Sequence, residues 1–88
     1  MTVGSPTVTL FARDGCCLCD DARSSLQRLR DELDFALRER DITTDDELHR
    51  AYLERIPVVA VDGEVVCELT LDEPAVRAAL RRTRVRAR

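Results

Sequence analysis

The sequence lacks several residue types, and each absence limits what the chain can be. It has no Trp, one Tyr and two Phe, so aromatic residues make up only 3% of its 88 residues. Lys and Asn are also missing, and all 14 basic residues are Arg, a bias that favours a GC-rich, bacterial genome. The longest wholly apolar run, residues 58–61, is far shorter than the roughly 20 residues of a membrane-spanning helix.

The N-terminal residues 1–6 carry neither the basic stretch nor the apolar stretch of a secretory signal. We therefore expect a protein that is neither exported nor inserted in a membrane, and that works in the reducing cytoplasm. Four cysteines in that compartment favour redox chemistry or metal binding over structural disulfides.

A chain with 44% hydrophobic and 35% charged residues can build one small hydrophobic core, but its length does not allow two. We expect one domain over residues 1–88, with an ordered core over about 7–82 and a basic tail over 83–88. The net charge is −3 despite this Arg-rich end. We interpret the tail as the solvated end of a helix, where cations are favoured, and not as a nucleic-acid-binding segment.

Hydrophobic periodicity divides the chain into strands and helices. Strands are expected at 7–11, 35–42, 56–61 and 64–67, and helices at 17–33, from 44 to about 55, and from 72 onward.

The second of these helices has a capping signal. Thr44 and Glu47 match a capping box that would open it, with Leu48, Ala51 and Tyr52 facing inward.

The resulting order is β-α-β-α-β-β-α. Two strands joined by a helix are parallel, whereas the Asp62-Gly63 turn makes the last two strands antiparallel. The sequence therefore predicts an α/β domain with a mixed four-stranded sheet flanked by helices.

Cys16-Cys17-Leu18-Cys19 places a C-x-x-C motif where the first strand ends and the first helix begins. Unpaired N–H groups and the positive end of the helix dipole favour an anion there, so the pKa of the Cys16 thiol should fall below its usual value. Cys19 lies one turn further in. We predict that Cys16 attacks a disulfide and that Cys19 resolves the product.

Other residues near the motif have less defined roles. Arg13 would add positive potential, while Asp14 and Asp20 would oppose it. Cys17 is interpreted as a passive, solvent-facing thiol, although it could pair with Cys19 or with an external thiol. Cys67 is expected to fill the core and His49 to be solvated; no Cys/His spacing predicts a zinc site.

These segments resemble the glutaredoxin-like branch of the thioredoxin fold over residues 7 to 82. The resemblance lies in the strand 7–11 leading to the 13–19 loop, in the segment 55–59 with its Ile56-Pro57 pair, and in the hairpin 61–66. It implies that Pro57 is a cis-proline against the cysteine pair, and that the Ile56 backbone pairs with an extended thiol substrate. Arg13 takes the place of the family's basic residue before the first cysteine.

The resemblance has one departure. Typical glutaredoxins carry a Gly-Gly stretch after the fourth strand that holds glutathione, whereas residues 67–72 here contain no glycine and include Glu68. This argues against tight binding of glutathione, without excluding it, and no tightly bound cofactor is expected.

Taken together, we expect a monomeric thiol–disulfide oxidoreductase acting on protein or low-molecular-weight disulfides. Its electron donor would be glutathione or a flavoprotein reductase, and neither nucleic acid nor membrane would be a partner. Two alternatives stay open: a metal or iron–sulfur module using Cys16, Cys17 and Cys19, and a non-catalytic interaction domain.

Overall fold

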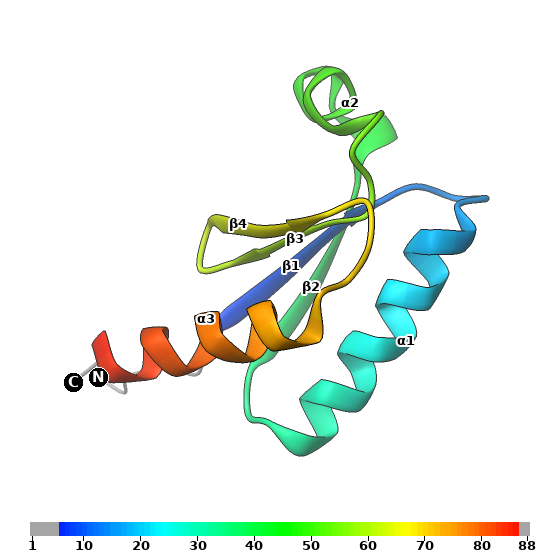
Figure 1. Ribbon diagram of the computed structural model, residues 1–88. Coiled ribbons are helices and arrows are strands. Elements are labelled where there is room, and N and C mark those ends of the chain that lie inside the picture. The colour runs from blue at the N-terminus through cyan, green and yellow to red at the C-terminus, as the bar shows by residue number, and fades with distance from the viewer. Residues whose placement is uncertain (1–5, 87–88) are drawn as a thin grey trace.

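The structure, a computed structural model, describes residues 6–86, with side chains to residue 82 (Figure 1). Its elements are β1 (Thr7–Ala12), α1 (Cys17–Glu32), β2 (Ala36–Asp41), the 3-10 turn η1 (Ile42–Thr44), α2 (Asp46–Tyr52), β3 (Val58–Val61), β4 (Glu64–Glu68) and α3 (Glu73–Arg86). Apart from η1, this is the predicted order.

The four strands form one mixed sheet in the order β2-β1-β3-β4. β1 and β2 are parallel, whereas β3 runs antiparallel to both β1 and β4. β2 and β4 are therefore the edge strands. The predicted sheet is confirmed, including the parallel first pair and the antiparallel hairpin.

The main core lies between one face of the sheet and the helices α1 and α3, which cover that face together (Figure 1). Alternate residues of β1 point into it because side chains of a strand alternate between faces. α1 contributes one stripe at helical spacing, and α3 contributes a shorter one. The buried side chains of this core include Val8, Leu10, Ala12, Ala22, Leu26, Leu29, Val76, Ala79 and Leu80.

α2 lies on the opposite face of the sheet, beyond its carboxyl end (Figure 1). It reaches β1 through Tyr52, whose ring contacts Phe11. None of its residues is buried. Leu48 and Tyr52 are half-buried, as the i, i+4 spacing allows, whereas Ala51 is exposed and its predicted inward position is wrong. His49 is half-buried, less exposed than expected, on a helix that packs mainly against η1.

The start of α2 also differs from the prediction. Asp45, and not Thr44, caps the helix: its Oδ1 accepts the N–H groups of Glu47 at 2.9 Å and Leu48 at 3.3 Å. Thr44 ends η1 instead, and its hydroxyl donates to the Asp41 carbonyl at 2.8 Å. Thr44, which was predicted to begin the helix, belongs to the 3-10 turn, so α2 begins later, at Asp46.

Two predicted strands are longer than the observed ones. Phe35 is buried but precedes β2, and Ile42 is buried in η1 instead of ending the strand. α2 ends at Tyr52, short of residue 55, and Ile56 and Pro57 come before β3. In each case an apolar residue that lies in a turn continued the hydrophobic pattern of the neighbouring element. The predicted element was therefore too long.

The hairpin between β3 and β4 turns at Asp62 and Gly63, with φ of 50° and 88°. Two positive φ angles are what a type I′ turn requires, and its twist matches that of the strands. Asp62 also binds β1, since its Oδ1 accepts the Thr7 N–H at 2.8 Å.

α3 begins at Glu73 with Pro74 in its first turn, as predicted. It continues to Arg86, so the helix includes part of the segment 83–88 that the sequence analysis treats as a tail; the side chains of that segment lie outside the described residues. Across residues 6–86, no helix combines the length and apolarity needed to cross a membrane.

Candidate redox site

Cys16 and Cys19 are joined in a disulfide, with their Cα atoms 5.1 Å apart. This separation lies within the usual range for disulfides. The two residues that the sequence predicted to work as a pair are therefore bonded to each other, at the start of α1.

α1 begins at this point because the chain turns sharply before it. Gly15 has φ of 80°, which an L-residue with a Cβ rarely adopts. Cys16 then takes the N-cap position with extended backbone, and its Sγ accepts the Cys19 N–H at 3.1 Å. The sulfur thus occupies the place that a capping oxygen usually has, at the positive end of the helix.

The two sulfur-bearing residues differ in accessibility. Cys19 has 0% of its surface exposed, inside the core between α1 and the sheet. Cys16 is half-buried and packs against the edge of that core. An incoming thiol or disulfide can therefore reach Cys16 but not Cys19.

The Ile56-Pro57 peptide bond is cis, as the resemblance implies. Pro57 is buried directly before β3, and the antiparallel pairing of Phe11 with Val58 brings it to the end of the sheet where β1 leads into the disulfide loop. Ile56 packs against the same core as Cys16. Its N–H donates to the Tyr52 carbonyl at 3.0 Å.

Leu69 is a feature of this end of the sheet that the sequence did not reveal. It has φ of 70°, and its N–H is shared by the carbonyls of Arg55 at 2.8 Å and Pro57 at 3.0 Å. Its side chain is 53% exposed, similar to the 52% of Leu18 beside the disulfide. The two are large apolar side chains exposed at the carboxyl end of the sheet.

Arg23 was also missed, because its partner lies on another element. It binds both carboxylate oxygens of Glu39 on β2, through its Nε at 2.7 Å and a terminal nitrogen, and its other terminal nitrogen lies 2.7 Å from Asp20. These hydrogen bonds raise the pKa of Arg23 above its usual value. The only signal in the sequence was the i, i+3 spacing of Asp20 and Arg23.

The other predicted groups are not part of the disulfide. Arg13 is exposed in the loop between β1 and α1, and Cys17 is an exposed free thiol at the first position of α1. Cys67 is buried on β4, and this burial raises the pKa of its thiol. Among residues 6–82, no three His, Cys, Asp or Glu side chains converge to hold a metal ion.

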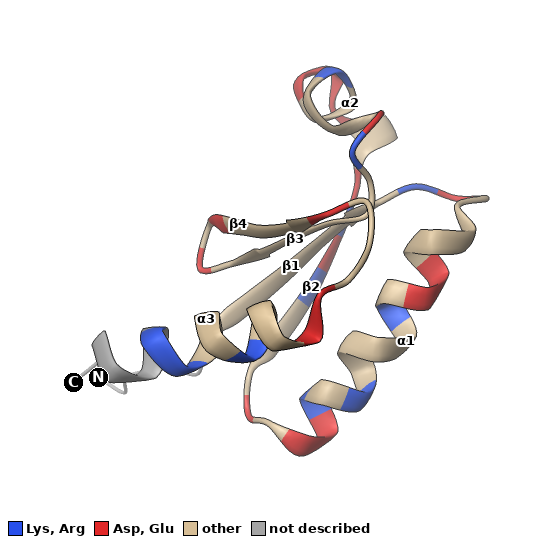
Figure 2. Ribbon diagram, in the orientation of Figure 1, with Lys and Arg blue, Asp and Glu red and all other residues tan. Residues whose placement is uncertain are grey.

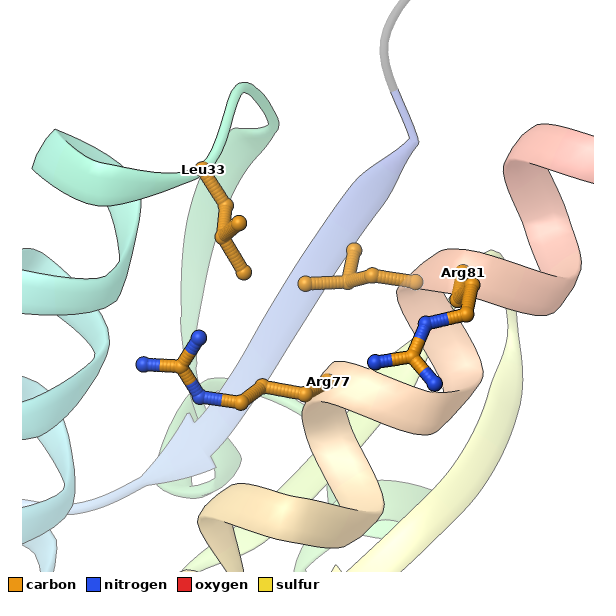
Figure 3. A pocket seen from close by; sticks show the side chains of 4 residues that line it. Leu33, Arg77 and Arg81 are labelled. Atoms are coloured by element: carbon orange, nitrogen blue, oxygen red, sulfur yellow. The ribbon is translucent and has the colours of Figure 1, made fainter.

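A hollow between α1 and α3 is lined by Leu33, Arg77, Leu80 and Arg81 (Figure 3). Arg77 reaches from α3 toward α1 there, and its terminal nitrogen lies 2.7 Å from a Glu32 oxygen. Because Leu33 follows the last residue of α1, the hollow is at the opposite end of that helix from the disulfide. It contains no nucleophile, and we do not assign it to the redox site.

Residues 7–81 match the model of the family described as Glutaredoxin-like domain (DUF836). The chain belongs to this family. The match runs from the first residue of β1 into α3, and so includes the disulfide, the cis-proline and the hairpin.

Proteins of similar sequence and structure come from several bacteria. The chain is 31% identical to an uncharacterised protein of Mycobacterium tuberculosis (Rv0508), over 89% of this chain and 86% of that one. It is similar to the solution structure of Ne2328 from Nitrosomonas europaea, with 28% identity, a TM-score of 0.77 and coverage of 89% and 94%. A protein from X. campestris gives 34% identity, a TM-score of 0.69 and coverage of 85% and 96%.

The thioredoxin fold that the resemblance implies is confirmed. A thioredoxin from Halobacterium salinarum superposes with a TM-score of 0.65 at 25% identity, over 90% of this chain and 74% of that chain. The protein is therefore a glutaredoxin-like member of the thioredoxin superfamily, with its close cysteine pair at the start of α1.

Proposed function

We propose that this glutaredoxin-like protein is a thiol–disulfide oxidoreductase in which Cys16 attacks and Cys19 resolves. One observation carries the proposal: the sulfur of the half-buried Cys16 caps α1 and accepts the Cys19 N–H at 3.1 Å, while Cys19 is fully buried. A hydrogen bond and a helix N-terminus both stabilise a thiolate, which is the reactive form of cysteine.

The reaction would proceed in two exchanges. In the reduced protein, the Cys16 thiolate attacks one sulfur of a substrate disulfide, which releases the other sulfur as a thiolate and leaves a mixed disulfide on Cys16. Cys19 then gives up its proton, attacks the Cys16 sulfur and releases the second substrate thiolate. The protein ends with the Cys16–Cys19 disulfide and has passed two electrons to the substrate.

An external thiol must return these electrons. We infer that glutathione or a flavoprotein reductase does so in the cytoplasm, and that the substrates are protein or low-molecular-weight disulfides. Arg13, Ile56 and Pro57 would contact the substrate beside Cys16. Glutathione would act from solution and not as a bound cofactor, because Glu68 and the exposed Leu69 take the place of the glycines that hold it in typical glutaredoxins.

Reduction of insulin disulfides, with dithiothreitol as the electron source, tests the proposal. Cys16→Ser should abolish the reaction, and Cys19→Ser should stop it at a mixed disulfide that mass spectrometry locates on Cys16. Cys17→Ser is the matched control, because its thiol is adjacent and exposed but outside the disulfide; this variant should keep the wild-type rate. Unchanged activity in Cys16→Ser, or none in the wild-type protein with any donor, would overturn the proposal.

The Cys19→Ser variant also serves to find the natural substrate. Incubated with cell lysate, it should hold partner proteins as mixed disulfides that reducing agent releases. The same lysate treated with the Cys16→Ser, Cys19→Ser double variant provides the background.

A further inference from the structure

Asp20 lies in the first turn of α1, four residues after Cys16. The Asp20 N–H donates to the Cys16 carbonyl at 3.1 Å, which is the first hydrogen bond of the helix. Asp20 is the acidic residue of the first turn of α1. A negative charge in this turn opposes a thiolate on Cys16 and weakens the effect of the helix N-terminus.

Arg23 sits where it can offset this charge. One terminal nitrogen of its guanidinium lies 2.7 Å from Asp20 Oδ1. The rest of the group binds both oxygens of Glu39, which anchors the cation on β2. Figure 2 shows the acidic and then basic residues that follow the first turn of α1.

We propose that Arg23 is a positioning residue of the redox site, which holds the Asp20 carboxylate against a cation fixed on β2 and so protects the negative charge on Cys16. This inference rests on the proposed function, because it concerns the thiolate form of Cys16. Arg23 acts through Asp20 and does not itself contact the sulfur.

Other charged groups lie around the same end of the sheet and contribute to the electrostatic potential at Cys16. They are Arg13 and Asp14 in the loop before Cys16, Asp21 in α1, the Arg55–Glu68 pair at 3.8 Å beyond Pro57, and Asp72 before α3. Within residues 6–82 none of these groups forms an ion pair with Asp20, which pairs with Arg23.

The test measures the reactivity of Cys16 as a function of pH. The reduced protein, in a Cys17→Ser background, is treated with iodoacetamide, and mass spectrometry follows alkylation of Cys16. Arg23→Gln should move the pH profile upward and lower the alkylation rate at pH 7 by about threefold, because less thiolate is present. Adding Asp20→Asn to Arg23→Gln should restore the original profile. High salt should reduce the difference, since these side chains are partly exposed.

Arg77→Gln is the matched control for a purely structural effect. Arg77 joins α1 to α3 through Glu32 at 2.7 Å, and its side chain is 36% exposed against 31% for Arg23. It lies at the other end of α1 (Figure 3). Its loss should loosen the helix to a similar degree and leave the pH profile of Cys16 unchanged.

Two results would overturn the inference: an Arg23→Gln profile that superimposes on the wild-type one, or an equal displacement in Arg77→Gln. Failure of the proposed function would look different. In that case Cys16 would still be alkylated with a displaced profile in Arg23→Gln, but no variant would reduce a disulfide.

Discussion

The ring of Phe11 on β1 lies against the ring of Tyr52 on α2, with centroids 4.9 Å apart and planes tilted by 39°. Tyr52 also holds the loop that follows it, since its carbonyl accepts the N–H groups of Arg55 at 2.8 Å and Ile56 at 3.0 Å. One residue thus attaches the outer helix to the sheet and fixes the approach to Pro57.

Replacing Tyr52 by Ala should therefore loosen α2 more than any other single change in that helix. Aromatic pairs contribute about 0.5–1.5 kcal/mol beyond the burial of their surface. We expect the free energy of unfolding to fall by about 1–2 kcal/mol and hydrogen exchange in α2 to become faster. Leu53→Ala is the control, because Leu53 is 38% exposed and follows Tyr52 directly. Equal effects of the two changes would show that the ring contact does not anchor the helix.

The two free thiols should differ in their reaction with an alkylating reagent. In the oxidised protein, Cys17 is exposed and should be labelled at once, whereas Cys67 is 7% exposed and has a raised pKa. We expect one label per chain under native conditions and two in urea, counted by mass spectrometry. Rapid double labelling without denaturant would contradict the buried position of Cys67.

The buried Cys67 thiol should make the stability of the protein fall at alkaline pH. Burial raises the pKa of its thiol in the folded protein, so the folded state binds the proton more tightly than the unfolded state. This contribution is fully present below the unfolded pKa, about 8.5, and is lost as pH rises through the folded pKa. The wild-type protein should lose more stability between neutral and alkaline pH than Cys67→Ala does, as urea titrations at the two pH values would show.

The cap of α2 offers a test of a single hydrogen-bonding side chain. Asp45 accepts two backbone N–H groups of the helix, at 2.9 and 3.3 Å. Asp45→Ala should lower the free energy of unfolding by about 1 kcal/mol. Thr44→Ala removes only the exposed hydroxyl bond to Asp41, and its cost should be smaller. A larger stability loss in Thr44→Ala than in Asp45→Ala would instead support the capping box that the sequence predicted.

The hairpin turn depends on the conformation of Gly63. Its φ is 88°, and no atom lies within 4 Å of the place where a Cβ would stand. Gly63→Ala should therefore cost about 1–2 kcal/mol through backbone conformation alone. Gly63→Asn should cost less, because Asn adopts positive φ more readily. Thermal unfolding of both variants would show whether the order holds.

Short-range patterns predicted most of this fold correctly. The period of two in β1, the helical stripe of α1 and the Asp62-Gly63 pair depend on neighbours close in sequence, so their structures could be read directly. The cysteine pair was equally local. For the same reason, the position of Cys16 at the cap of a helix followed from the change in period at that residue.

The parts that the sequence did not show depend on contacts between distant elements. Arg23 finds Glu39 only after β2 has paired with β1, and Leu69 takes its positive φ because carbonyls on either side of Ile56 bind its N–H. The choice of Asp45 over Thr44 as the cap, in contrast, depends on residues close in sequence. Both are good capping residues, but Thr44 is the last residue of the 3-10 turn η1, which leaves Asp45 as the cap of α2.

The outer edge of β2 faces no other strand of the sheet. Along it, the exposed Arg38 and Arg40 flank Glu39. An extended segment from another molecule would have to strip water from these guanidinium groups before it could form backbone hydrogen bonds. Such charge is a common way for proteins to prevent edge-to-edge aggregation. Arg38 and Arg40 thus protect the β2 edge of the sheet against pairing with another chain.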